Sequence, residues 1–186
     1  MSVFISCCVN KTKTMKHIKF YMALATITAT ILGCTTQEQI QCEELFQTKV
    51  ELEKNVEMYA AVWERVVDER NISLIDTLFF DPNATVITSN GNVEGIDAFK
   101  DFYSNYLTGF SDAEFKVIDA FGQGDRIVKH WQFKGTHDGE FFGIPATNKK
   151  VDLKGTTLVT MKNGRVMYEE DYFDNYSLLK QIGMLQ

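Results

Sequence analysis

Residues 151–173 read VDLKGTTLVTMKNGRVMYEEDYF, and this stretch decides the fold. Two strand-like runs flank Asn163-Gly164, a dipeptide that strongly favours a tight hairpin turn. The pattern therefore predicts antiparallel strands over 151–162 and 165–173. Successive side chains of a strand point to opposite faces, so Glu169 and Asp171 share a face and lie about 7 Å apart along the strand.

The partner strand carries an almost wholly apolar row on one face. The row consists of Val151, Leu153, Gly155, Thr157, Val159 and Met161. If it shares a face with Glu169 and Asp171, the two carboxylates lie against an apolar wall. Desolvation and like-charge repulsion would then raise the pKa of at least one carboxyl group, and a proton shuttle would work near neutral pH. The alternative is that both carboxylates face water, as acidic residues on strands usually do.

The elements around this hairpin predict an α+β domain. An apolar stripe at three- and four-residue steps predicts an amphipathic helix over residues 43–70. The other expected elements are a short helix over 73–78, a strand over 84–89 with a turn at Asn90-Gly91, a helix over 97–107, strands over 115–121 and 127–135, and a last helix over 175–182. Helices followed by strands predict one curved antiparallel sheet packed against N-terminal helices.

The first 33 residues are typical of a signal segment. Of 19 Lys and Arg, only Lys11, Lys13, Lys16 and Lys19 precede residue 34, whereas all 25 Asp and Glu follow it. Residues 20–32 form an uncharged run after the cationic start, as in a secretory signal. The run is too short for a transmembrane helix, which needs about 20 apolar residues. Met15, which begins Met-Lys-His-Ile-Lys, is an alternative start of translation.

Ile31-Leu32-Gly33-Cys34 follows the apolar run and resembles the bacterial lipobox, whose cysteine is lipidated. The resemblance implies a lipid anchor at Cys34, a tether over 34–42 and a single domain over 43–186. It also implies a location at the bacterial cell envelope, on the periplasmic or outer-membrane side, with the anchor as the only membrane contact. A plain signal peptide, or a buried apolar helix that ends in Gly-Cys, is the alternative interpretation.

Several classes of site are excluded or disfavoured. The net charge of −6 disfavours a nucleic-acid binder, which relies on clustered Lys and Arg. No cysteine follows Cys42, so the domain has neither a thiol nucleophile nor a thiolate metal site. The chain contains no phosphate-binding loop, Gly-x-Ser-x-Gly elbow or His-Glu-x-x-His motif. Only His130 and His137 follow the signal segment, so no metal is expected.

A series of short motifs occurs in a characteristic order between about Val56 and Leu185. They are Phe110-Ser111-Asp112, Gly135-Thr136-His137-Asp138-Gly139-Glu140, Phe142-Gly143-Ile144-Pro145-Ala146-Thr147, Asn163-Gly164-Arg165-Val166, Asp171-Tyr172-Phe173-Asp174 and Leu178-Leu179-Lys180-Gln181-Ile182-Gly183. In this order the chain resembles the SnoaL-like polyketide cyclases, which belong to the nuclear transport factor 2-like superfamily.

The resemblance implies a cone-like α+β barrel around an apolar pocket. Family cyclases need no metal or cofactor, and a pocket aspartate moves protons during an intramolecular aldol ring closure. That aspartate falls on Asp171, ten residues before the Gln of the C-terminal motif. Asp174 is instead expected to cap the last helix. Thr157 and Glu169 stand where such cyclases carry histidines, and His137 matches a family histidine near the barrel mouth.

Three hypotheses follow, and the sequence slightly favours binding of a small hydrophobic ligand. In the first, Asp171 is a general acid/base and Glu169 tunes its pKa, while Thr157 or Tyr103 donates a hydrogen bond to a developing oxyanion. Thr157, Tyr103, His137 and Trp131 are the expected substrate-binding residues. In the second, the domain binds a ligand or partner without turnover. In the third, it is a homodimerisation module. Polyketide cyclisation itself is not expected at an envelope membrane.

Overall fold

The structure, a computed structural model, describes residues 25–185, with side chains from residue 37 onward. Helix α1 (Ala25–Asp68) begins well before the predicted Glu43, so the segment expected to be a tether over 34–42 is helical. Its Gln and Glu residues favour helix and no proline interrupts it. Most of the expected signal segment lies outside the described residues. Within residues 25–185, no helix combines the length and apolar content of a membrane span.

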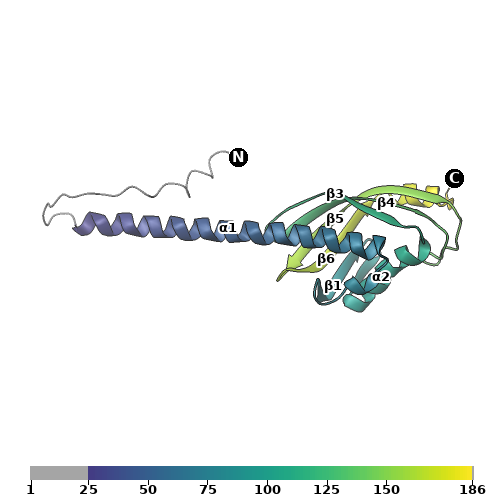
Figure 1. The fold of residues 1–186 in the computed structure, drawn as a ribbon, viewed down its shortest axis with the longest axis horizontal. Coiled ribbons are helices and arrows are strands. Elements are labelled where there is room, and N and C mark those ends of the chain that lie inside the picture. The colour runs from purple at the N-terminus through teal and green to yellow at the C-terminus, as the bar shows by residue number, and fades with distance from the viewer. Residues whose placement is uncertain (1–24, 186) are drawn as a thin grey trace. The chain divides into compact units, whose positions relative to one another are not determined.

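Residues 51–185 contain a curved mixed sheet (Figure 1). Its strands are β1 (Phe80–Thr88), β2 (Gly91–Glu94), β3 (Glu114–Gln123), β4 (Arg126–Thr136), β5 (Lys150–Lys162) and β6 (Arg165–Phe173). Their order is β2-β1-β6-β5-β4-β3. The α+β class is confirmed, but the expectation of a wholly antiparallel sheet is wrong, because β1 pairs with β6 in parallel. No hairpin joins these two strands, so no turn between them fixes their relative direction.

The sequence-based boundaries fail mainly between residues 72 and 94. The predicted helix over 73–78 is only a 3-10 turn, Ile72–Leu74. Asp81-Pro82-Asn83, which falls between the predicted helix over 73–78 and the predicted strand over 84–89, lies inside β1. The β1–β6 register shifts between Phe80 and Thr85, around that proline, which has no N–H group for the ladder. The turn at Asn90-Gly91 was predicted, but the short strand β2 that follows it was not.

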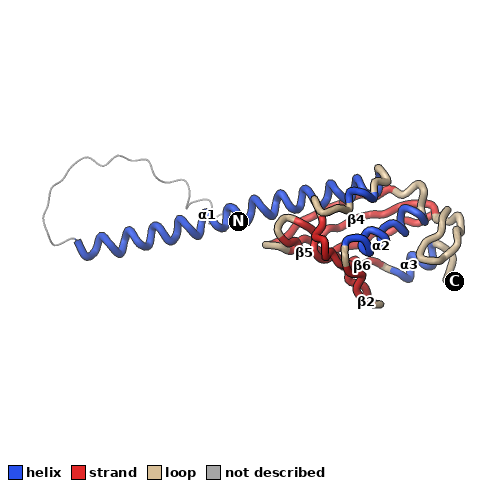
Figure 2. Tube along the Cα trace, turned by 90° about the horizontal axis from the view of Figure 1, so that it is seen from below, coloured by secondary structure: helices blue, strands red, loops and turns tan. Residues whose placement is uncertain are grey.

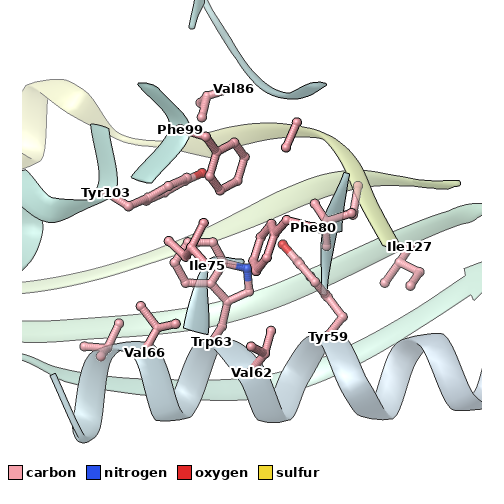
Figure 3. Close-up of a cluster of buried hydrophobic side chains, with 14 of the residues drawn as sticks. Tyr59, Val62, Trp63, Val66, Ile75, Phe80, Val86, Phe99, Tyr103 and Ile127 are labelled. Carbon is pink, nitrogen blue, oxygen red and sulfur yellow. The ribbon is translucent and has the colours of Figure 1, made fainter. Parts of the chain in front are cut away.

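Helix α2 (Ile96–Gly109) and residues 51–68 of α1 lie on the same side of the sheet (Figures 1 and 2). Figure 3 shows Tyr59 and Trp63 of α1 pointing towards Phe80, Phe99 and Tyr103. The ring centroids of Trp63 and Tyr103 are 4.5 Å apart, in an edge-to-face arrangement that aromatic rings prefer. This aromatic layer fills the space between the helices and the sheet.

A second buried cluster lies at the other end of the strands. It includes Phe110, Trp131, Phe133, Phe141, Val151, Leu153, Leu178 and Ile182. Helix α3 (Asn175–Gln181) contributes Leu178, and its N-cap is Asp174, whose side chain accepts a hydrogen bond from the Ser177 N–H at 3.0 Å. The predicted cap is therefore confirmed. Partly buried Tyr106 and Phe115 pack against both clusters, and a cavity lies beside these two rings.

Candidate functional site

Neighbouring strands place the candidate residues in register on the helix-covered face of the sheet. Thr157 of β5 pairs with Asp171 of β6 and with Lys129 of β4. Glu169, two residues before Asp171 on β6, pairs with Val159. Thr157 and Val159 are both fully buried, so the predicted apolar wall is confirmed.

The side chains of Lys129, Thr157, Glu169 and Asp171 meet at a cavity of about 60 Å³. It is lined by Trp63, Val66, Val67, Tyr103, Tyr106, Leu107, Phe115, Lys129, Trp131, Phe133, Leu153, Thr157, Glu169, Asp171 and Phe173. Five of the expected residues therefore come together here: Asp171, Glu169, Thr157, Tyr103 and Trp131. Glu169 is 1% exposed, whereas Asp171 is only half-buried and lies on the more accessible side of the pair.

Asp171 is held by two hydroxyl groups. The Thr157 hydroxyl donates to Asp171 Oδ1 at 2.5 Å, and Thr157 in turn accepts from the Trp131 indole N–H at 2.9 Å. The Tyr103 hydroxyl oxygen lies 2.9 Å from Asp171 Oδ2. Both hydroxyls that were expected to face a developing oxyanion are thus used on Asp171. They fix the orientation of its carboxylate against the cavity.

Tyr103 also links Asp171 to Glu169. Its hydroxyl oxygen lies 2.8 Å from Glu169 Oε2, while Glu169 Oε1 accepts from the Trp63 indole N–H at 2.8 Å. A hydroxyl carries one proton and can donate to only one of two carboxylates. Both contacts are hydrogen bonds when Tyr103 donates its proton to Asp171 and a protonated Glu169 donates to the Tyr103 oxygen. The site then holds one neutral and one ionised carboxyl group.

The environment of Glu169 agrees with this count. Burial raises the pKa of Glu169 above its usual value, opposed by the charge of Lys129 and reinforced by that of Asp171. Burial also raises the pKa of Tyr103 well above 10, and the two carboxylates add to that rise. Tyr103 therefore remains a hydrogen-bond donor at any ordinary pH.

His137 lies outside this cavity. It is fully buried, its Nδ1 is 3.0 Å from the Thr147 hydroxyl, and its ring packs against Phe110 and Phe141. Its backbone N–H donates to the Lys149 carbonyl at 2.8 Å. The structure therefore places the ring in the core beneath the loop over residues 137–149. It does not line the site with the other expected residues.

Sequence reasoning missed two members of the site. Trp63 was expected only as part of an apolar helix stripe, but its indole N–H holds Glu169. Lys129 was not singled out, although it interrupts the alternating apolar row Ile127, Trp131 and Phe133 on the inward face of β4. A single lysine within an alternating apolar row is the sequence signal that could have identified Lys129 as a site residue. Burial lowers the pKa of Lys129 to about 8, opposed by the charges of Glu169 and Asp171.

A metal centre finds no support in the described part of the chain. Across those residues, no group of three or more His, Cys, Asp and Glu side chains is arranged to hold a metal ion. The titratable side chains that line the cavity are those of Tyr103, Tyr106, Lys129, Glu169 and Asp171.

This chain matches several solved structures of similar fold over almost their whole length. A protein described as a SnoaL-like polyketide cyclase from Jannaschia sp. CCS1 is 26% identical, with a TM-score of 0.63 over 72% of this chain and 94% of its own. TsrD from Streptomyces laurentii is 18% identical, with a TM-score of 0.62 over 73% and 97%. TerC, co-crystallised with polyporic acid, is 20% identical, with a TM-score of 0.56 over 69% and 98%.

The comparison with curated proteins finds no match. The profile of the family described as SnoaL-like polyketide cyclase matches residues 53–182, which include every strand and all the cavity residues. This match covers well over half of the sequence, and the chain therefore belongs to the SnoaL-like polyketide cyclase family.

Proposed function

We propose that the cavity binds a small hydrophobic carbonyl compound and that Asp171 transfers a proton to and from it as a general acid/base. One observation carries the proposal. The Asp171 carboxylate borders an aromatic cavity and is held by Thr157 and Tyr103, with the buried Glu169 behind it. A carboxylate fixed by two hydroxyl donors beside an apolar wall suits proton abstraction next to a carbonyl group.

The lining and the volume limit the ligand. Aromatic and aliphatic side chains form most of the wall, so the ligand is expected to be apolar and uncharged. The volume of about 60 Å³ corresponds to roughly four to six water-sized groups. The ligand of this chain is therefore expected to be a small carbonyl compound.

In the proposed step, ionised Asp171 accepts a proton from the carbon next to the carbonyl group. Charge develops on the carbonyl oxygen, and Asp171 later returns the proton to the rearranged product. Thr157 and Tyr103 position the carboxylate throughout, because both hydroxyls point at its oxygens. Glu169 keeps its proton and adds no second negative charge at the cavity.

Deuterium exchange tests the proposal. Butanone is incubated in D₂O with the full chain, and loss of its α-proton resonance is followed by NMR. Asp171→Asn is expected to slow the exchange by roughly 10²–10⁴-fold while butanone binding, read from tryptophan fluorescence, is retained. Asp119→Asn, an exposed aspartate on β3, is the matched control. Equal exchange with Asp171→Asn would overturn the acid/base role. Binding without exchange by either protein would instead support a non-catalytic binding module.

We also propose that Cys34 is lipidated and anchors the chain at a bacterial cell envelope. The support is the sequence Ile31-Leu32-Gly33-Cys34 after a cationic start and an apolar run. Metabolic labelling with a tagged fatty acid in a bacterial host tests it. Cys34→Ala should abolish the label and Cys42→Ala should retain it. Label on the Cys34→Ala variant would refute the anchor.

We further propose that two copies pair through the outer face of the sheet. Exposed apolar rings, Phe121 of β3 with Tyr168 and Tyr172 of β6, support this, since such side chains favour a protein partner. Light scattering should give the mass of two copies, and Phe121→Glu should reduce it to one. A single-copy mass for the unmodified chain would remove the proposal.

A further inference from the structure

Lys129 is a buried cation that the proposed acid/base step leaves without a role. It is 3% exposed, and its Nζ lies 4.6 Å from the ring centroids of Tyr59 and Trp63 and 5.0 Å from that of Phe115. Such rings attract a cation, but more weakly than a carboxylate in direct contact. The lysine thus lines the cavity with three aromatic rings around its ammonium group.

Among the described residues, no direct ion pair neutralises this ammonium group. The ion pairs seen among the described side chains, Arg65–Glu69 and Lys134–Asp152, do not include Lys129. Burial without a contacting carboxylate disfavours the charged form, and the pKa of Lys129 falls to about 8. Near neutral pH, roughly one lysine in ten therefore carries a free lone pair. A desolvated amine of this kind is a competent nucleophile.

The sheet places this amine in the same row as the proposed acid/base, two strands away. Lys129, Thr157 and Asp171 pair in one row across β4, β5 and β6, so Lys129 and Asp171 flank Thr157 on the same face. Both line the same cavity. A carbonyl carbon bound at Lys129 therefore lies within the space that the Asp171 carboxylate borders.

We propose that Lys129 forms an iminium with a small aldehyde or ketone in the cavity, with Asp171 transferring the protons. This inference rests on the proposed function and specifies its ligand class. The Lys129 ammonium gives a proton to Asp171, and the Nζ lone pair then attacks the carbonyl carbon as the C=O π electrons move to oxygen. Protonated Asp171 gives its proton to that oxygen and takes one from the nitrogen, which forms a carbinolamine and leaves Asp171 protonated. Protonated Asp171 then protonates the hydroxyl group, the C–O bond breaks and water leaves. The nitrogen lone pair forms the C=N bond, and Asp171 is again ionised.

Reductive trapping tests the inference on the full chain. The protein is treated with butanal and sodium cyanoborohydride at pH 7, so that hydride reduces any iminium to a stable butyl-lysine found by peptide mass mapping. Lys134, an exposed lysine on the same strand, is the internal reference. Lys129 should be labelled at least about tenfold faster than Lys134, because burial lowers the pKa of Lys129 to about 8 and leaves part of it unprotonated at this pH. The labelling rate of Lys129 should level off above pH 8.

Variants separate this inference from the proposed function. Asp171→Asn should slow labelling of Lys129 and leave that of Lys134 unchanged, while Lys129→Met should remove the adduct at that peptide. Labelling of Lys129 no faster than that of Lys134 would overturn the iminium, even where butanone exchange still depends on Asp171. Fast labelling of Lys129 together with exchange that ignores Asp171→Asn would support the amine site and refute the acid/base role of Asp171.

Discussion

Replacing Glu169 with glutamine tests the proton count at the centre of the site. A glutamine amide has the shape of a protonated glutamate, with one oxygen to accept from Trp63 and an NH₂ group to donate to Tyr103. Glu169→Gln should therefore preserve both 2.8 Å contacts. Glu169→Ala removes both, and leaves the buried Trp63 N–H without an acceptor.

The magnitudes differ clearly between the two variants. A buried donor left without a partner costs about 1–3 kcal/mol, and the emptied space adds to that cost, so Glu169→Ala should lose about 2–5 kcal/mol of unfolding free energy. Glu169→Gln should stay within about 1 kcal/mol of the unmodified chain near pH 4.5. The folded-state pKa of Glu169 is raised above the unfolded value of 4.5. Its contribution to stability is thus fully present below pH 4.5 and is lost as pH rises through the folded pKa, by about 1.4 kcal/mol per pH unit.

Urea unfolding between pH 4 and 8, followed by the fluorescence of Trp63 and Trp131, measures this difference. Glutamine cannot ionise, so the stability of Glu169→Gln relative to the unmodified chain should increase with pH over that window. Glu170→Gln, at the next position of β6 and on the opposite face, is the matched control and should retain the original pH dependence. An unchanged slope in Glu169→Gln, or a loss equal to that of Glu169→Ala, would mean that Glu169 is ionised in the folded protein.

Three further outcomes are expected. Because the pKa of Lys129 falls from 10.5 to about 8, the unfolded chain binds more protons between these values; stability should rise by about 3 kcal/mol across that range, and Lys129→Met should abolish the rise in urea titrations. In Gly155→Ala the new Cβ would lie 2.4 Å from Trp131 Cζ2 and 2.8 Å from the Tyr172 backbone oxygen, so the indole must move. A loss of about 1–3 kcal/mol and a shifted tryptophan emission should follow, and unchanged values would contradict the packing. Asp174→Ala should lose about 1 kcal/mol in thermal unfolding without altering butanone affinity, since it removes only a helix cap.

The fold could be predicted where local chemistry fixes it. The hairpin of β5 and β6 follows from Asn163-Gly164 and the alternation on both sides, and β6 has the predicted bounds. The parallel pairing of β1 with β6 could not be predicted, because it depends on how distant segments meet. One local irregularity also escaped the alternation. The pairing of β5 with β6 shifts by one residue at Thr160/Met161, so that Met161 pairs with Val166. Val166 is therefore buried, whereas Met167 is only half-buried.

The site could be predicted only along the strands. A period of two placed Glu169, Asp171 and Thr157 on one face, but it does not say which carboxylate is covered. That is decided by Trp63 and Tyr103, which lie 106 and 66 residues from Glu169 in sequence and meet it only in the folded chain. The burial of Glu169 also depends on the two helices that carry these residues, α1 and α2. The difference between a sealed Glu169 and a half-open Asp171 therefore has no counterpart in the local sequence.

Charge balance connects the two proposals. With Glu169 neutral, the cavity holds one anion, Asp171, and one cation, Lys129, and a ligand that binds without charge leaves this balance unchanged. An enolate formed by Asp171 alone would place a new negative charge in an apolar cavity, where desolvation makes it costly. An iminium keeps the positive charge on Lys129, so removal of the α-proton then yields a neutral enamine while Asp171 becomes neutral. The number of charges in the cavity thus falls during the step. This route through a neutral enamine depends on Lys129 at an inward position of β4, because no other cation lines the described cavity.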